Sequence, residues 1–213
     1  MFDVKKLKCY NIIIETSKKE SLMNYNASQL LVWIDLETTG LDQDFGMLGC
    51  IKHKILEIGV HITDEKLNII DEGLNIVIHQ DIHEILNLSS AYVINMHENN
   101  GLFEKVKKST TNLIEAEKLI ISHLKKYGIE KGVSPVCGNN VGFDKNFINA
   151  QMNELNDFLH YRKIDVSSFK ELFKRREPEV ADKVSKKLSH RALDDIKESI
   201  EELKVYSEFI FSS

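Results

Sequence analysis

Residues 31–40 read Leu31-Val32-Trp33-Ile34-Asp35-Leu36-Glu37-Thr38-Thr39-Gly40. The run begins with large apolar and β-branched residues and ends in a turn signal, which is typical of a buried strand. Because residues i and i+2 of a strand share a face, Asp35 and Glu37 are predicted to point the same way. Two like charges buried together are costly unless a cation compensates them, and hard divalent cations take oxygen ligands. The triplet alone is a weak signal, because most D-x-E triplets are two carboxylates at a solvated strand end, and a metal site is the sharper alternative.

The composition indicates an ordinary globular domain that works in a reducing compartment. The 213 residues suffice for one domain with a core, and 42% are hydrophobic. The net charge is −5, whereas proteins that grip long nucleic acids carry basic surfaces. Any nucleic-acid substrate is therefore expected to be short or held mainly through bound metal. Three widely spaced cysteines without a C-x-x-C pair argue against a disulfide framework and a zinc ribbon.

The N-terminal residues show no membrane or export signal. No uncharged apolar run approaches the ~20 residues that span a membrane, so no membrane partner is expected. Residues 1–29 are interpreted as a variable extension with a short amphipathic segment around 12–14. The extension lacks Arg and contains acidic residues, unlike a mitochondrial presequence. We expect a cytoplasmic protein, and mitochondrial import stays the open alternative.

The rest of the chain alternates between strand and helix patterns. Residues 55–63 and 74–79 read as strands that form an antiparallel meander with the first one. Further strands are predicted near 135–140 and 164–167, and helices over 90–97, 112–127, 144–155, 168–176 and 193–206, with loops at 41–54 and 178–189. This order predicts a single α/β domain over residues 30–213 with a mixed sheet.

Three more residues complete a chemical pattern. Asp144 lies just after a strand at a helix start, and Asp195 lies near the start of the last helix, five residues after His190. Alone, each Asp has a plain role as a helix-dipole partner, and a lone His is usually packed in the core. Together, the order Asp-x-Glu, Asp, His-x-x-x-x-Asp resembles the DEDDh exonuclease superfamily.

The similarity extends to the oligoribonuclease family. The matching segments are W-I-D-L-E-T-T-G-L-D (33–42), I-T-D-E-K-L-N-I-I-D-E-G (62–73), C-G-N-N-V-G-F-D (137–144), H-Y-R-K-I-D-V-S-S (160–168) and S-H-R-A-L-D-D-I-K-E-S-I (189–200). They run from about residue 30 to the C-terminus, and the H-Y-R and S-H-R-A-L-D-D segments separate the family from proofreading exonucleases. The resemblance implies a ribonuclease H-like fold, in which helices flank a central mixed sheet.

The resemblance also implies a mechanism. Asp35, Glu37, Asp144 and Asp195 would hold two Mg²⁺ or Mn²⁺ ions, as two-metal hydrolysis requires. His190 would be the general base for the attacking water, because its pKa lies near working pH. Nucleoside 5′-monophosphates would then leave stepwise from the 3′ end of a very short RNA.

Four substrate-binding residues carry over from the family. Leu41 matches a wedge against the bases, and Tyr92 matches an aromatic that stacks on a base, with Tyr in place of the usual Trp. His97 and Asn140 match positions near the substrate phosphates, with Asn140 in place of the usual Ser.

A further group implies a homodimer. Tyr161 and Arg162 resemble residues that the second subunit supplies, and Ser167 lies nearby in the sequence. Arg suits a terminal phosphate, because the guanidinium binds it through two parallel hydrogen bonds.

Two further features depart from the family pattern. Phe143 stands where bacterial members carry Gln, and the loop over 43–54 is several residues longer than usual and close to the metal residues.

Two alternatives to degradation of very short RNA remain open. One is a DEDDh exonuclease that trims or proofreads longer RNA or DNA. The acidic balance and the H-Y-R segment argue against it. The other is a non-catalytic nucleic-acid-binding scaffold. Such a scaffold usually lacks a metal ligand, and all five motif residues are present here.

Overall fold

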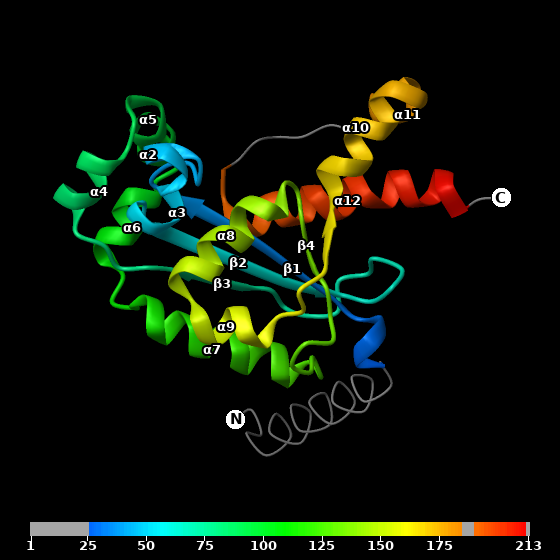
Figure 1. Ribbon diagram of the computed structural model, residues 1–213, viewed down its shortest axis with the longest axis horizontal. Coiled ribbons are helices and arrows are strands. Elements are labelled where there is room, and N and C mark those ends of the chain that lie inside the picture. Colours follow the sequence, from blue (N-terminus) through cyan, green and yellow to red (C-terminus); the bar gives the residue numbers. More distant parts are fainter. Residues whose placement is uncertain (1–25, 185–189, 212–213) are drawn as a thin grey trace, which may run out of the picture.

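A computed structural model describes residues 26–184 and 190–211. Figure 1 shows a central sheet surrounded by helices. The five strands lie in the order β3-β2-β1-β4-β5. They are β1 (Leu31–Thr38), β2 (Ile55–Thr63), β3 (Leu74–Val77), β4 (Val136–Gly138) and β5 (Lys163–Asp165). The first three pair antiparallel, while β4 and β5 run parallel to β1, which confirms the predicted meander and mixed sheet.

Alternation along β1 divides the core between the two faces of the sheet. Val32, Ile34 and Leu36 belong to a core that also contains apolar residues of α7 (Leu113–Lys126), α8 (Val141–Gln151) and α9 (Asn153–Phe158). Trp33 belongs to a second core with α10 (Val166–Arg176) and α12 (Ala192–Phe211). Asp35 and Glu37 follow Trp33 at steps of two, so they share the sheet face that α12 covers.

Gly59 sets how closely α12 approaches the sheet. It lies directly opposite Asp35 in the ladder between β1 and β2. A Cβ atom at residue 59 would lie 2.8 Å from the backbone carbon of Ala192, which is closer than such atoms approach. The missing side chain therefore lets the first turn of α12 rest on β2 next to Asp35.

The predicted loops and one predicted helix differ from the structure. The 41–54 loop contains two four-residue helices, α2 (Asp44–Met47) and α3 (Gly49–Lys52), and the 178–189 loop begins with α11 (Pro178–Ala181). The helix predicted over 144–155 begins earlier, at Val141, and is split at Met152 into α8 and α9. α5 (Ala91–Asn99) was expected, whereas η1 (Ala27–Gln29), α4 (Ile82–Leu88) and α6 (Leu102–Lys108) were not.

Most of the predicted N-terminal extension lies outside the described residues. That includes the segment around 12–14 that we interpreted as amphipathic. Of residues 1–29, the structure describes 26–29, where the Asn26 side chain caps η1. Within the described part of the chain, no helix combines the length and apolar character needed to cross a bilayer.

Candidate active site

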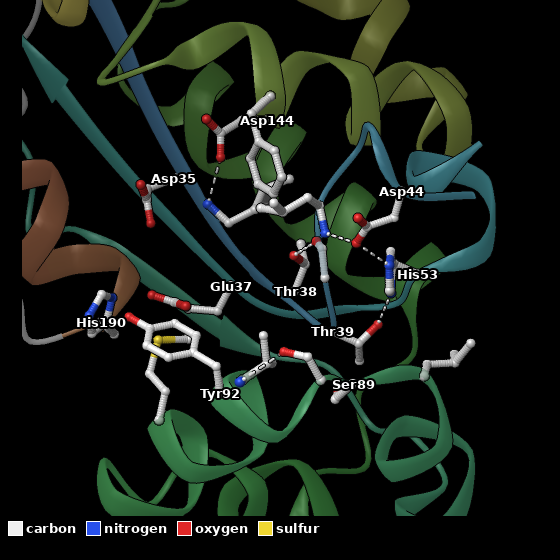
Figure 2. Close-up of a pocket in the computed structure, with 18 of the residues that line it drawn as sticks. Asp35, Glu37, Thr38, Thr39, Asp44, His53, Ser89, Tyr92, Asp144 and His190 are labelled. Atoms are coloured by element: carbon white, nitrogen blue, oxygen red, sulfur yellow. Dashed lines mark hydrogen bonds and ion pairs between the residues drawn. The ribbon is translucent and has the colours of Figure 1, made fainter. Parts of the chain in front are cut away.

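A cavity of about 800 Å³ lies where the carboxyl end of β1 meets α5, α8, α12 and the 41–54 segment. Figure 2 shows carboxylate, imidazole and aromatic side chains that line it. Eight of the predicted site residues are among the lining residues: Asp35, Glu37, Leu41, Tyr92, Asn140, Asp144, His190 and Asp195. The fold therefore gathers all five residues of the acidic and histidine pattern around one cavity.

Three carboxylates form the centre of the site. Asp35, Glu37 and Asp195 each contribute one oxygen, and these oxygens all lie within 4.8 Å of one another. Burial raises the pKa of Glu37 to about 8, and the neighbouring Asp195 and Glu57 add to this rise. Burial, Asp144 and Glu37 also raise the pKa of Asp35. A divalent cation would relieve this repulsion, so the donor set suits a hard metal ion.

Asp144 lies at the edge of this cluster. It is buried in the first turn of α8, and its Oδ1 accepts a hydrogen bond of 2.9 Å from the backbone N–H of Leu36 (Figure 2). Burial raises its pKa to about 7, although that hydrogen bond lowers it. The hydrogen bond ties α8 to β1 and holds the fourth carboxylate beside the strand end.

His190 lines the cavity immediately before α12 (Figure 2). Its backbone has φ +50°, and its carbonyl accepts a 2.7 Å hydrogen bond from Asn100 Nδ2. Left-handed backbone is uncommon outside glycine and persists where the surroundings enforce it. The contact with Asn100 ties this turn to the residue that follows α5.

An ion pair beneath the carboxylates was not predicted from the sequence. Glu57 is fully buried on β2 opposite Glu37, and it accepts two hydrogen bonds from Arg191, one of them 2.9 Å from Nε. It also accepts from Asn75 Nδ2 at 2.9 Å and from the N–H of Ala192 at 3.3 Å. Burial favours a raised pKa for Glu57, but the hydrogen bonds from Arg191 and Asn75 lower it below its ordinary value. The sequence feature that could have pointed to this ion pair is the single Glu in the apolar strand run over residues 55–60.

His97 lies behind the cavity wall, with no exposed surface. Its Nε2 lies 3.2 Å from the carbonyl oxygen of Thr38, which can only accept, and 3.9 Å from Glu37 Oε2. Burial lowers its pKa, which favours the neutral ring. In this arrangement His97 supports the end of β1, and it is not among the described residues that line the cavity.

Asn140 and Ser167 are connected through Asp165, which was not among the predicted residues. Asp165 Oδ1 accepts hydrogen bonds from the N–H of Asn140 at 2.9 Å, the N–H of Ser167 at 3.0 Å and the hydroxyl of Ser167 at 2.7 Å. The left-handed turn at Asn140, with φ +59°, is thereby fixed to the start of α10.

Tyr161 and Arg162 lie away from the cavity of their own chain. Tyr161 is 73% exposed, and the Arg162 guanidinium lies 5.5 Å from the centre of its ring. Both precede β5, and neither is among the described residues that line the cavity.

Comparisons with known proteins agree with this geometry. Residues 32–203 match the RNase_T exonuclease family. The oligoribonuclease of Vibrio campbellii is 44% identical over 185 residues, which cover 87% of this chain and 97% of that protein. The oligoribonuclease of Pseudoalteromonas translucida is 46% identical over 190 residues, which cover 89% and 99%.

Solved structures share the fold at much lower identity. Pop2p of S. pombe, in a form with bound Mg²⁺ and Mn²⁺, superimposes with a TM-score of 0.65 at 13% identity and covers 93% of this chain and 91% of that one. A complex of E. coli exonuclease I with single-stranded DNA gives 0.59 at 12% identity and covers 86% and 41%. These likenesses confirm the predicted ribonuclease H-like exonuclease fold. The match over residues 32–203 and the near full-length similarity to curated relatives show that the chain belongs to the oligoribonuclease family of exonucleases.

Proposed function

We propose that this protein is a 3′-to-5′ exoribonuclease that hydrolyses very short oligoribonucleotides to nucleoside 5′-monophosphates. The observation that carries the proposal is the cluster of three carboxylate oxygens within 4.8 Å, in one cavity with Asp144 and His190. The curated relatives named oligoribonuclease support the choice of short RNA as substrate.

The residues divide the chemistry among them. Asp35, Glu37 and Asp195, with Asp144 beside them, would hold two divalent ions, Mg²⁺ or Mn²⁺. Bound ions of this kind lower the pKa of water and stabilise the charge on the leaving oxygen. An imidazole nitrogen of His190 takes the proton of the attacking water. Leu41 and Tyr92, which both line the cavity, hold the bases on either side of the scissile phosphate.

The substrate length is tested with 5′-phosphorylated RNAs of two to about twenty nucleotides. We expect kcat/KM to fall steeply beyond a few nucleotides, because a net charge of −5 leaves no extended basic track for further phosphates. Removal of the 5′ phosphate from a dinucleotide should also lower kcat/KM. The decrease should be smaller for Arg162→Ala than for the wild type. A flat length profile would instead favour trimming or proofreading of longer chains.

We also propose that the enzyme is a homodimer in which Tyr161 and Arg162 of one subunit, with Ser167 nearby, complete the site of the other. Mixing an Arg162→Ala chain with an Asp35→Ala chain is expected to restore activity, because one site of each mixed dimer then has both residues. Activity is measured after subunit exchange and compared with each variant alone. A fully active monomer at assay concentration would contradict the proposal.

The same relatives bear on the cellular location. We propose a cytoplasmic enzyme, because the curated relatives named above are bacterial oligoribonucleases. Cell fractionation distinguishes this location from the mitochondrial alternative.

A further inference from the structure

The 41–54 segment forms one wall of the cavity, and an aromatic residue is among those that it contributes. Leu41, Asp44, Phe45 and His53 all line the cavity. The Phe45 side chain is 51% exposed. A half-exposed Phe is unremarkable alone, but this one shares its cavity with the catalytic carboxylates.

The backbone at Phe45 has an uncommon conformation. Phe45 has φ +55° and ψ +35°, and it is followed by Gly46 with φ +67° and Met47 with φ +72°. Bulky residues rarely adopt the left-handed region, and they persist there where the surroundings hold them, often next to ligand sites. The conformation sets the direction in which the Phe45 side chain leaves the loop.

A hydrogen-bonded chain fixes the loop around Phe45. Asp44 Oδ2 accepts from the N–H of Leu41 at 2.9 Å and lies 2.9 Å from His53 Nε2 (Figure 2). His53 Nδ1 lies 2.9 Å from Thr39 Oγ1. Thr39 is fully buried and His53 is 3% exposed, so the chain is anchored in the protein interior.

Two neighbours flank the Phe45 ring itself. The His53 ring lies 5.1 Å away, centre to centre, at an interplanar angle of 45°. Lys52 Nζ lies 5.4 Å from the ring centre. The ring is thus braced by the loop, while the Phe45 side chain stays half exposed at the cavity, which is an arrangement suited to receiving a flat partner.

We propose that Phe45 is a further substrate-binding residue that stacks on a nucleobase of the bound oligonucleotide, in addition to the contacts of Leu41 and Tyr92. The inference rests on the proposed function, since the cavity must receive RNA. Every nucleobase has a π face, and stacking on an aromatic side chain tolerates any sequence. Loss of one such stack weakens binding by about 5- to 150-fold.

The test compares Phe45→Ala and Phe45→Trp with Met47→Ala as the matched control. Met47 lies in the same loop, has a positive φ and is 70% exposed, but it is absent from the described lining of the cavity. Diribonucleotides that carry 2-aminopurine at the 5′ or the 3′ position report stacking through quenched fluorescence. Binding is measured with Ca²⁺ in place of Mg²⁺ to slow hydrolysis, and kcat and KM are measured with Mg²⁺.

Phe45→Ala should raise the Kd and KM by about 5- to 150-fold with little change in kcat, and should relieve the quenching at one of the two positions. Phe45→Trp should retain both properties, and Met47→Ala should match the wild type. A dinucleotide that is abasic at the reporting position should bind to wild type and Phe45→Ala equally.

Three outcomes would overturn the proposal. They are unchanged quenching at both positions in Phe45→Ala, an equal loss of affinity for the abasic substrate, or an equal loss in Met47→Ala. If the wild type hydrolyses short RNA while Phe45→Ala behaves normally, the stacking role fails and the proposed function stands. If the wild type hydrolyses no RNA, the proposed function fails, and the fluorescence titrations still decide whether Phe45 stacks on a base.

Discussion

Asp35→Asn is expected to lower kcat/KM by at least about 10³-fold while making the metal-free protein more stable at pH 8. Activity falls because Asp35 supplies one of the three clustered carboxylate oxygens. Stability rises because the neutral amide no longer repels Glu37 and Asp144, and both of these neighbours raise the pKa of Asp35. Single-turnover hydrolysis of a dinucleotide and thermal melts in EDTA measure the two effects.

The pH dependence of the melts separates this explanation from a general effect of mutation. In the folded, metal-free protein, burial raises the pKa of Glu37 from 4.5 to about 8 and that of Asp144 from 3.8 to about 7. Between about pH 4 and pH 8, these two carboxyl groups therefore hold more protons in the folded state than in the unfolded state. As a result, the contribution of these two carboxyl groups to the free energy of unfolding is fully present near pH 4 and is lost as the pH rises toward 8.

In Asp35→Asn, stability should fall less steeply as the pH rises. Added Mn²⁺ should abolish the loss of stability at high pH in the wild type but not in the variant. Asp194→Asn is the matched control, because Asp194 is exposed in the same first turn of α12 and is not among the described cavity residues. It should keep the wild-type activity and pH profile. A metal-free wild type that is equally stable at pH 5 and pH 8 would contradict the electrostatic account.

Arg191→Met is expected to destabilise the fold by about 3–5 kcal/mol. The variant leaves the carboxylate of Glu57 buried without its cationic partner, although Asn75 and the N–H of Ala192 still donate to it. It also releases the first turn of α12, which positions Asp195, so kcat should fall together with stability. Urea denaturation near pH 7 measures the change in free energy of unfolding.

The double variant Arg191→Met/Glu57→Gln tests the cause of that loss. Most of the stability should return, because the second change removes the uncompensated buried charge. Arg175→Met is the control, since Arg175 pairs with the exposed Glu171 on the surface of α10 and its loss should change stability little. If the double variant is no more stable than Arg191→Met alone, the buried charge is not the cause.

The sequence by itself determined the features that depend on neighbouring residues. Alternation along residues 31–38 places Asp35 and Glu37 on one face of β1, because successive side chains of a strand point to opposite faces. The periodic apolar residues near the C-terminus likewise predicted α12, and the order of acidic residues and His190 indicated the exonuclease class. The first two signals lie within short stretches of the chain, and the third is an order of residues that can be read without knowing any distance between them.

The tertiary structure alone decided the distances across the fold. Asp195 reaches Asp35 because Gly59, far away in the sequence, lets α12 rest on the sheet. The partner of Glu57 is likewise separated from it by 134 residues, and no local pattern specifies such a pair.

Packing also decided the place of one predicted substrate residue and of the long loop. His97 carries a polar ring but is fully buried against Thr38. It lies on the side of α5 that packs against the end of β1. Phe45 belongs to a segment that the sequence presented as a loop, and its approach to the cavity depends on the contacts of Asp44 with Leu41 and His53. Side-chain chemistry can be read along the chain, but which groups meet is set by how the helices pack on the sheet.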